Sequence, residues 1–227
     1  MNTQRSRPLI VAIDGPSGVG KGTVSRALAK ALGYRHIDTG AMYRAVAWTA
    51  RQQGLPLEDE AAVADLASHA EMSMEDGAVS VDGVDVTRAI RTPEMDLAAA
   101  AVARMPRVRA VLVDRQRALG RPGGVVMEGR DIGTVVFPDA DVKIYLDASP
   151  DERARRRAAD PAHGGSPKAL ADVATALAAR DQSDQTRAAS PLTIAPDAVL
   201  VDTTGVSVDE VVAKVLAIVR NRLQIDD

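Results

Sequence analysis

The chain has 227 residues with a formal net charge of −3, and it contains 46% hydrophobic and 26% charged residues. Such values are ordinary for a globular protein with a large core, so we expect a single domain spanning 1–227. The charge balance gives no overall reason to expect a nucleic acid or a membrane as partner. No apolar run could span a bilayer, the N-terminus lacks a signal-peptide core, and cysteine is absent. We therefore expect a cytoplasmic protein without disulfides or thiol metal sites.

Arginine dominates the basic residues. Only five of the 28 basic residues are lysines. Guanidinium groups bind phosphates and carboxylates through two parallel hydrogen bonds, so clustered arginines suit an anionic substrate. Coding bias in a GC-rich genome would also enrich arginine, and the many alanines fit that alternative. The positions of the arginines must therefore decide between the two.

The first motif lies in residues 9–28, LIVAIDGPSGVGKGTVSRAL. Its apolar start, 9–13, is typical of a strand buried on both faces of a parallel sheet. A glycine-rich loop and a helix starting near Lys21 follow, which is the order of a phosphate-binding P-loop. The loop amides, the helix N-terminus and Lys21 would together hold the phosphates of a nucleoside triphosphate. A glycine-rich turn without a ligand is the alternative.

The next segments supply a helix and an insertion. Residues 36–54 begin with a turn and helix cap at Asp38, and Arg44 lies on the first turns of that helix. Arg44 is either a ligand contact near the loop or a solvated helix charge. In 57–104 a short alanine-rich helix precedes alternating residues around two glycine turns, which indicates a β-hairpin or small meander. We interpret 57–104 as an inserted lobe that closes over a substrate, with simple decoration as the alternative.

Two further core strands are predicted at 125–127 and 142–146, after a helix at 106–119. Segment 128–134 falls at the carboxyl end of the first of these strands. Ligands of open α/β sheets bind outside such ends, so we expect Arg130 and Asp131 to face a ligand. A structural ion pair is the alternative.

The C-terminal part contains an arginine-rich helix start and the last elements of the α/β order. Ser149 caps a helix that carries Arg153, Arg155, Arg156 and Arg157, and a Gly- and Pro-containing segment follows at 160–167. We interpret 152–167 as a lid that grips phosphates, although a solvated helix face is the usual explanation of a charge run. A helix from 168 to about 182, a strand at 198–201 and a helix at 208–223 complete the alternation.

Seven segments together resemble the bacterial cytidylate kinases, in order and at compatible spacing over nearly the whole chain. They are GPSGVGKGT, DTGAMYR, IRTPE, PRVR, EGRDIGTVVFPDA, KIYLDAS followed by ERARRR, and RDQSDQTRAASPL. Gly22 stands where the strict P-loop has Ser or Thr, and Gly-Lys-Gly-Thr is the form typical of nucleoside monophosphate kinases. We therefore expect an α/β P-loop NTPase fold of three layers, with a central parallel sheet flanked by helices, a small β-containing insertion lobe and a short lid.

The resemblance implies transfer of the γ-phosphoryl group of ATP to CMP or dCMP, with Mg²⁺, by a protein that we expect to be a monomer. The ATP-binding residues implied are Gly15, Pro16, Ser17, Gly18, Val19, Gly20, Lys21, Gly22, Thr23 and Arg156; the catalytic residues are Lys21, Arg130, Arg153 and Arg157. For CMP, the residues implied are Arg44, Arg130 and Arg187 at the α-phosphate, Arg109 and Asp131 at the cytosine, Arg180 and Asp184 at the pentose, and Thr39 beside the nucleotide. No protein residue is assigned to a metal. Ala100 departs from a base-contacting Ser found in some members.

Other P-loop functions fit less well. A regulatory GTPase typically carries Asn-Lys-x-Asp, yet the only asparagines are Asn2 and Asn221. A kinase for adenylate, uridylate or shikimate stays open, and substrate preference would separate it from a cytidylate kinase. A nucleic-acid-binding protein would need aromatic stacking platforms, and the chain has one Trp, three Tyr and one Phe.

Overall fold

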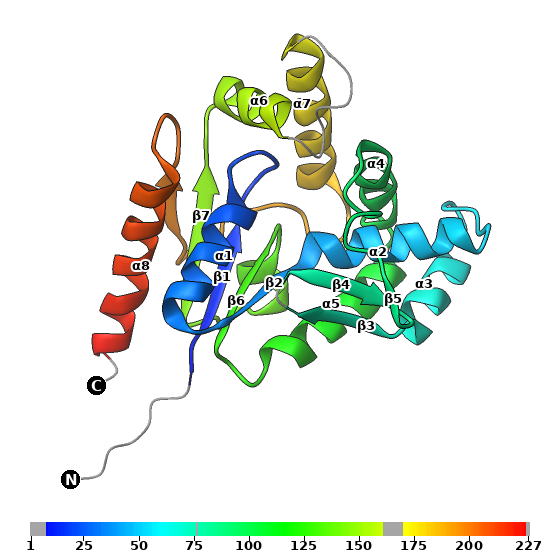
Figure 1. The fold of residues 1–227 in the computed structure, drawn as a ribbon, viewed down its shortest axis with the longest axis horizontal. Coiled ribbons are helices and arrows are strands. Elements are labelled where there is room, and N and C mark those ends of the chain that lie inside the picture. Colours follow the sequence, from blue (N-terminus) through cyan, green and yellow to red (C-terminus); the bar gives the residue numbers. More distant parts are fainter. Residues whose placement is uncertain (1–7, 76, 161–169, 226–227) are drawn as a thin grey trace.

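A five-stranded parallel sheet forms the centre of the molecule (Figure 1). The structure, a computed structural model, describes residues 8–75, 77–160 and 170–225. The strands lie in the spatial order β2-β6-β1-β7-β8, and their bounds are β1 Ile10–Asp14, β2 Arg35–Asp38, β6 Val125–Gly129, β7 Val142–Asp147 and β8 Val199–Asp202. All pairings are parallel, so the carboxyl ends of the strands share one edge of the sheet. Ligands of such sheets bind at that edge.

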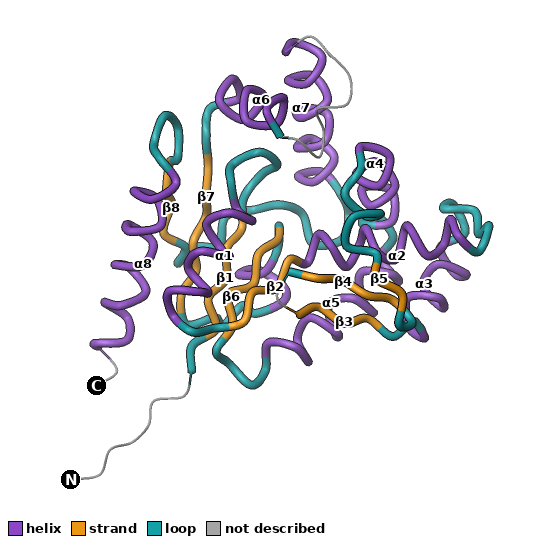
Figure 2. The backbone as a smooth tube through the Cα atoms, in the orientation of Figure 1, coloured by secondary structure: helices purple, strands orange, loops and turns teal. Residues whose placement is uncertain are grey.

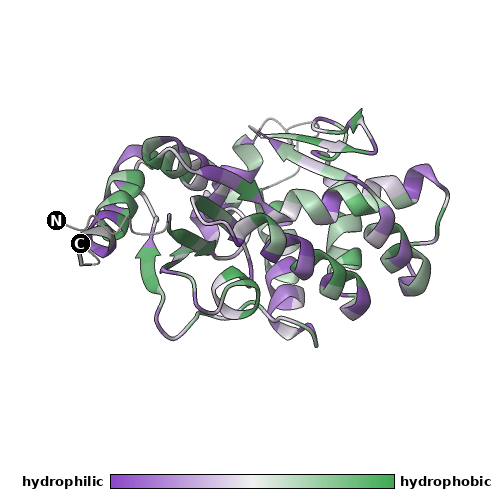
Figure 3. Ribbon diagram, turned by 90° about the horizontal axis from the view of Figure 1, so that it is seen from below, coloured by the Kyte–Doolittle hydropathy of each residue, from purple (hydrophilic) through white to green (hydrophobic). Residues whose placement is uncertain are grey.

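Alternate side chains of β1 enter two hydrophobic cores, one on each face of the sheet. Val11 belongs to a core with Leu28 of α1 and Val215 of α8. Ile10 belongs to a core with Val113 of α5 on the other face. The bounds of these helices are α1 Lys21–Leu32, α5 Pro106–Gly120 and α8 Val208–Ile225. The expected three-layer P-loop fold is thus confirmed, and in Figure 3 hydrophilic and hydrophobic residues alternate along the helices, as the sequences of helices with one buried side require.

The inserted segment adds a second sheet and a helical core beside the first. Its elements are α3 Glu60–His69, β3 Met72–Glu75, β4 Ala78–Val81, β5 Val84–Asp85 and α4 Pro93–Val102. The three strands form an antiparallel sheet in the order β3-β4-β5, as the expected meander requires. Val79 and Val81 of this sheet pack with Ala45 of α2 (Thr39–Gln52), while α2, α3, α4 and α5 share a core around Val46 and Leu112.

Helices α6 (Pro150–Ala159) and α7 (Leu170–Thr186) lie beyond the carboxyl edge of the sheet, above the P-loop in Figures 1 and 2. Ser149 caps α6 by accepting a hydrogen bond from the backbone N–H of Glu152 at 3.3 Å, as its sequence indicates. Residues 161–167 of the expected lid lie outside the described residues. No helix in the described ranges is long and apolar enough to cross a membrane.

Four elements differ from the sequence-based expectation. Strand β2 was not expected, since Asp38 alone among its residues was assigned, to a turn and helix cap, and helix α4 was not expected either. The helix expected to end at about residue 182 extends to Thr186. Residues Ile132–Val136 form a short π-helix directly after β6, with Phe137 N–H donating to the Ile132 carbonyl at 2.7 Å.

Gly15 should tolerate no side chain. Its φ is +149°, and a Cβ there would lie 2.1 Å from the backbone oxygen of Leu146 in β7. We expect Gly15→Ala to lower the free energy of unfolding by about 3 kcal/mol or more, since a strand must move. Gly33→Ala is the matched control, because its φ is +67° and nothing lies within 4 Å; it should cost only about 1 to 2 kcal/mol. Urea unfolding measures both, and equal costs would contradict the close approach to β7.

Candidate functional site

One cleft of about 760 Å³ lies at the carboxyl edge of the central sheet. The P-loop, α2, α4, α5, the end of β6, α6 and α7 all contribute to its walls. The sequence-predicted residues that line it are Ser17, Gly18, Val19, Gly20, Lys21, Gly22, Thr23, Thr39, Arg44, Arg109, Arg130, Asp131, Arg156, Arg157, Arg180, Asp184 and Arg187, together with Ala100. Gly15, Pro16 and Arg153 do not line the cleft but contact residues that do.

The P-loop holds its lysine in a bent conformation. Lys21 Nζ donates to the backbone oxygens of Gly15 at 2.8 Å and Pro16 at 2.6 Å, and the residue is only 7% exposed. Burial lowers the pKa of Lys21 well below its usual value, and nearby Arg130 lowers it further, while Glu128 acts in the opposite direction. The ammonium is therefore poorly solvated, which makes an incoming polyanion a favourable partner.

Helix α6 is tied to the P-loop by arginines. Arg153 pairs with Asp181 of α7, and its Nη1 donates to the Ser17 backbone oxygen at 3.3 Å. Arg156 Nη1 donates to the Val19 backbone oxygen at 3.3 Å, and its Nη2 donates to the Thr203 backbone oxygen at 2.6 Å. Arg153 and Arg156 of α6 thus lie directly beside the P-loop.

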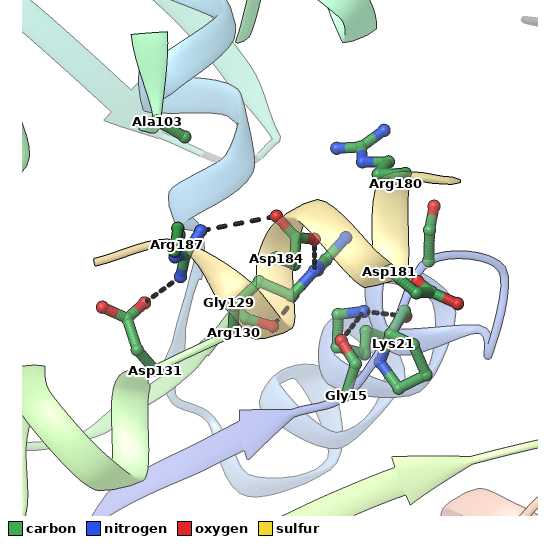
Figure 4. Close-up of polar contacts among 12 residues, drawn as sticks. Gly15, Lys21, Ala103, Gly129, Arg130, Asp131, Arg180, Asp181, Asp184 and Arg187 are labelled. Atoms are coloured by element: carbon green, nitrogen blue, oxygen red, sulfur yellow. Dashed lines mark hydrogen bonds and ion pairs between the residues drawn. The ribbon is translucent and has the colours of Figure 1, made fainter. Parts of the chain in front are cut away.

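In the same cleft, four side chains from α7, the residue after it and the segment after β6 form a chain of alternating charges (Figure 4). Arg130 Nε lies 3.0 Å from Asp184 Oδ2, and Arg187 Nη1 lies 3.4 Å from Asp184 Oδ1. Arg187 Nη2 lies 3.8 Å from Asp131 Oδ1. Arg109 of α5 pairs with Asp131 from the other side and stacks over the Tyr43 ring at 5.3 Å. Residues far apart in the sequence thus meet in one buried network.

Charges of both signs shift one another within this network. Burial raises the pKa of Asp184, but Arg130, Arg180 and Arg187 outweigh it and hold that pKa below its usual range. Burial lowers the pKa of Arg187, and the like charge of Arg109 lowers it further. Asp184 is therefore ionised at neutral pH and can act only as an acceptor.

Helix α2 brings two more predicted residues to the cleft. Asp38 caps α2 by accepting from the Ala41 N–H at 3.0 Å, and its other oxygen accepts from Arg44 Nη2 at 2.8 Å. Thr39 Oγ donates to the backbone oxygen of Glu128 at 2.7 Å, which ties the start of α2 to the end of β6. Arg44 therefore faces the cleft as an ion-paired side chain rather than as a solvated charge.

Several buried guanidinium nitrogens in the cleft lack a hydrogen-bond partner among the described residues. They are the Nε atoms of Arg44, Arg109 and Arg180 and the Nη2 atom of Arg187. A buried donor without a partner costs free energy, so such atoms mark places where a ligand supplies acceptors. All four belong to residues that the family resemblance assigns to the acceptor nucleotide, and the Nε atom of Arg153, beside the cleft, also lacks a partner among the described residues.

Sequence reasoning missed four carboxylates at the site. Asp96 of α4 pairs with Arg157, and Asp181 of α7 pairs with Arg153. Glu128, near the end of β6, has its Oε1 atom 2.7 Å from His36 Nε2. Its position at the carboxyl end of a buried strand was a signal in the sequence that could have marked it as a site residue. No signal in the sequence distinguishes Asp96 or Asp181 from surface acids.

The fourth missed carboxylate, Asp14, connects the P-loop to the segment that carries Asp131. Its Oδ1 accepts from the Ile132 N–H at 2.9 Å, and its Oδ2 accepts from the Gly133 N–H at 2.8 Å. Burial raises the pKa of Asp14 to about 6, although these two N–H groups oppose the rise. Asp14 thereby fixes the start of the π-helix against the end of β1.

Comparison with known proteins identifies the family. The family model described as "Cytidylate kinase" matches residues 11–221. A cytidylate kinase of Solibacter usitatus is 48% identical over 98% of this chain and 97% of its own length, and one of Geobacter sulfurreducens is 47% identical over 98% and 97%. A gluconokinase structure from Sinorhizobium meliloti, 17% identical, matches with a TM-score of 0.50 over 98% of this chain and 99% of that one, a likeness of fold alone. With a nearly full-length match and these motifs in one cleft, the chain belongs to the cytidylate kinase family.

Proposed function

We propose that this protein transfers the γ-phosphoryl group of ATP to CMP or dCMP, giving ADP and CDP or dCDP. The observation that carries the proposal is that the Arg130, Asp184, Arg187 and Asp131 network lines the same cleft as the P-loop. A phosphate-binding loop and an arginine-rich anion site in one cleft suit two phosphorylated substrates. The names of the relatives support CMP as the acceptor.

The reaction needs alignment and charge neutralisation rather than a protein nucleophile. An oxygen of the CMP α-phosphate attacks the γ-phosphorus of ATP, and the bond from that phosphorus to the bridging oxygen breaks. The electron pair of the broken bond stays with the leaving ADP. Lys21 and the lid arginines offset the charge on the transferred group, and the acceptor arginines hold CMP in line. The absence of cysteine and the presence of only three histidines fit this chemistry.

The proposed residue roles are those that the family resemblance implies. Gly15, Pro16, Ser17, Gly18, Val19, Gly20, Lys21, Gly22, Thr23 and Arg156 bind ATP, and Lys21, Arg130, Arg153 and Arg157 act on the transferred phosphoryl group. Arg44, Arg130 and Arg187 bind the CMP α-phosphate, Arg109 and Asp131 bind the cytosine, Arg180 and Asp184 bind the pentose, and Thr39 lies beside the nucleotide. Buried guanidinium nitrogens without a hydrogen-bond partner among the described residues, at five of these positions, support the assignment.

Mg²⁺ is the proposed metal, and the oxygen donors near the P-loop fit it. No group of three or more His, Asp or Glu side chains in the described ranges could hold a metal by itself. Mg²⁺ needs no such cage, because one or two carboxylates and substrate phosphates suffice. The Thr23 hydroxyl and the buried Glu128 carboxylate would hold it with the ATP phosphates. When bound, it would neutralise charge on those phosphates.

We propose that 57–104 is the monophosphate-binding lobe and that 152–167 is the lid of a single domain. The contribution of α4 to the cleft supports the first proposal, and the contacts of α6 with the P-loop support the second. Closure of the two over the substrates would exclude water, which otherwise competes with CMP as the acceptor. A monomer is sufficient for this arrangement, since the cleft is built from one chain.

The test is ADP release from ATP and Mg²⁺ with CMP, dCMP, UMP, AMP and shikimate offered separately, against a blank without acceptor. We expect fast turnover with CMP and dCMP, slow turnover with UMP and rates near the blank with AMP and shikimate. Rates near the blank with all five compounds would overturn the acceptor assignment.

A further inference from the structure

One carboxylate of the inserted segment lies among the arginines of the cleft. Asp96 on α4 forms an ion pair with Arg157 of α6. Its Oδ1 also lies 3.8 Å from Arg44 Nη1 of α2 and 3.8 Å from Arg180 Nη1 of α7. The Asp96 side chain is only 12% exposed. A single acidic side chain thus contacts cations from three other helices.

This arrangement has the chemistry of a bound phosphate. Guanidinium groups gathered in one place repel one another, and an anion between them offsets the repulsion. A carboxylate and a phosphate both present oxygens that accept from guanidinium N–H groups. The carboxylate of Asp96 therefore lies among these arginines in the way that a phosphate oxygen would.

We propose that Asp96 is a positioning residue that replaces a nucleotide phosphate in the unliganded protein. It holds Arg44, Arg157 and Arg180 together until a phosphate displaces it. The proposal rests on the proposed function, which assigns these three arginines to the nucleotides. Because the incoming anion must compete with Asp96, removing the carboxylate strengthens anion binding and destabilises the free protein.

A purely structural role gives the opposite result for binding. If Asp96 only tied α4 to α6 and α7, its loss would let the arginines separate, and anions would bind less tightly. The free protein loses stability under either explanation, so stability alone does not distinguish them. The affinity of the protein for a simple anion distinguishes the two explanations.

Inorganic pyrophosphate is the probe, and isothermal titration calorimetry at low ionic strength is the measurement. We expect the Kd of the Asp96→Asn protein for pyrophosphate to fall about tenfold below that of the unaltered protein, because one negative charge beside the bound anion is lost. The Asp96→Glu protein keeps the charge and should bind with an affinity close to the original. The Tm of free Asp96→Asn should fall, and saturating pyrophosphate should raise it by more than it raises the original Tm.

Asp114→Asn is the matched control. It removes the same charge from an exposed residue that lies 3.7 Å from Arg117 on the surface of α5, away from the cleft. Its Kd for pyrophosphate should change less than twofold. Asp96→Ser supplies a second neutral variant, so that a folding defect of Asp96→Asn leaves the question answerable. Unchanged or weaker pyrophosphate binding in the neutral variants would overturn the proposal.

The experiment separates this proposal from the proposed function. Pyrophosphate carries neither base nor pentose, so its binding does not depend on CMP being the acceptor. Tighter pyrophosphate binding together with rates near the blank for CMP and dCMP would leave Asp96 in this role and overturn the acceptor assignment. Turnover with CMP without tighter pyrophosphate binding would support the acceptor assignment and overturn the proposed role of Asp96.

Discussion

Replacing Lys21 with alanine is expected to lower kcat by about 10³-fold or more, because the ammonium stabilises charge on the transferred phosphoryl group. The fold should stay intact. Lys21 is buried against the Gly15 and Pro16 oxygens, and the loss of those two hydrogen bonds is offset by removal of a poorly solvated charge. Steady-state ADP release with saturating ATP and CMP measures kcat, and circular dichroism checks the fold.

Lys30→Ala is the control for that experiment. Lys30 lies on the exposed side of the same helix, in its last turn, and carries the same charge. Its removal should change kcat less than twofold. Near-normal turnover of a folded Lys21→Ala protein would refute the assignment of this loop to ATP.

Replacing Arg109 with methionine is expected to damage both stability and acceptor use. Arg109 is 2% exposed and pairs with Asp131, which is 4% exposed. Its loss leaves the buried carboxylate with Arg187 at 3.8 Å, and we expect a cost of about 3 kcal/mol in the free energy of unfolding. The kcat/KM for CMP should fall by about 100-fold, since Arg109 is proposed to bind the cytosine.

A second substitution separates the two effects. Arg109→Met combined with Asp131→Asn removes both charges, so urea unfolding should recover most of the lost stability while kcat/KM for CMP stays low. Arg107→Met, on the exposed side of the same helix, should affect neither quantity. Recovery of CMP turnover in the double variant would show that Arg109 acts only as a counter-ion.

The sequence predicted the parts of the fold and site that local chemistry determines. The P-loop and the neighbouring residues Arg130 and Asp131 depend on a strand, a turn and a few adjacent residues, and the structure places them in the lining of one cleft. Strand β2 was not predicted because it has only four residues and a single fully buried one, Ile37. Such a short segment shows no alternation of apolar and polar residues that would indicate a strand. Helix α4 escaped because its run of alanines carries little apolar periodicity.

The carboxylate partners of the arginines were not predictable for a different reason. The pairs join residues far apart in the chain, as Asp96 with Arg157 and Asp181 with Arg153 show. Each acid has ordinary neighbours in the sequence, and its role exists only after α4, α6 and α7 have packed. Clusters of one residue type are visible in a sequence, whereas their counter-charges emerge from the tertiary fold.

The two groups of residues beside the proposed base site differ in how many substitutions they can accept during evolution or design. Asp131 is fixed by buried ion pairs, and Asp14 anchors the segment that follows it. The facing residues from α4 and its end, Ala99, Ala100 and Ala103, line the cleft with single methyl groups. Larger or polar side chains at these alanines would reshape the space around the base without leaving any buried charge unpaired. New acceptor preferences are therefore more accessible through α4 than through Arg109 or Asp131.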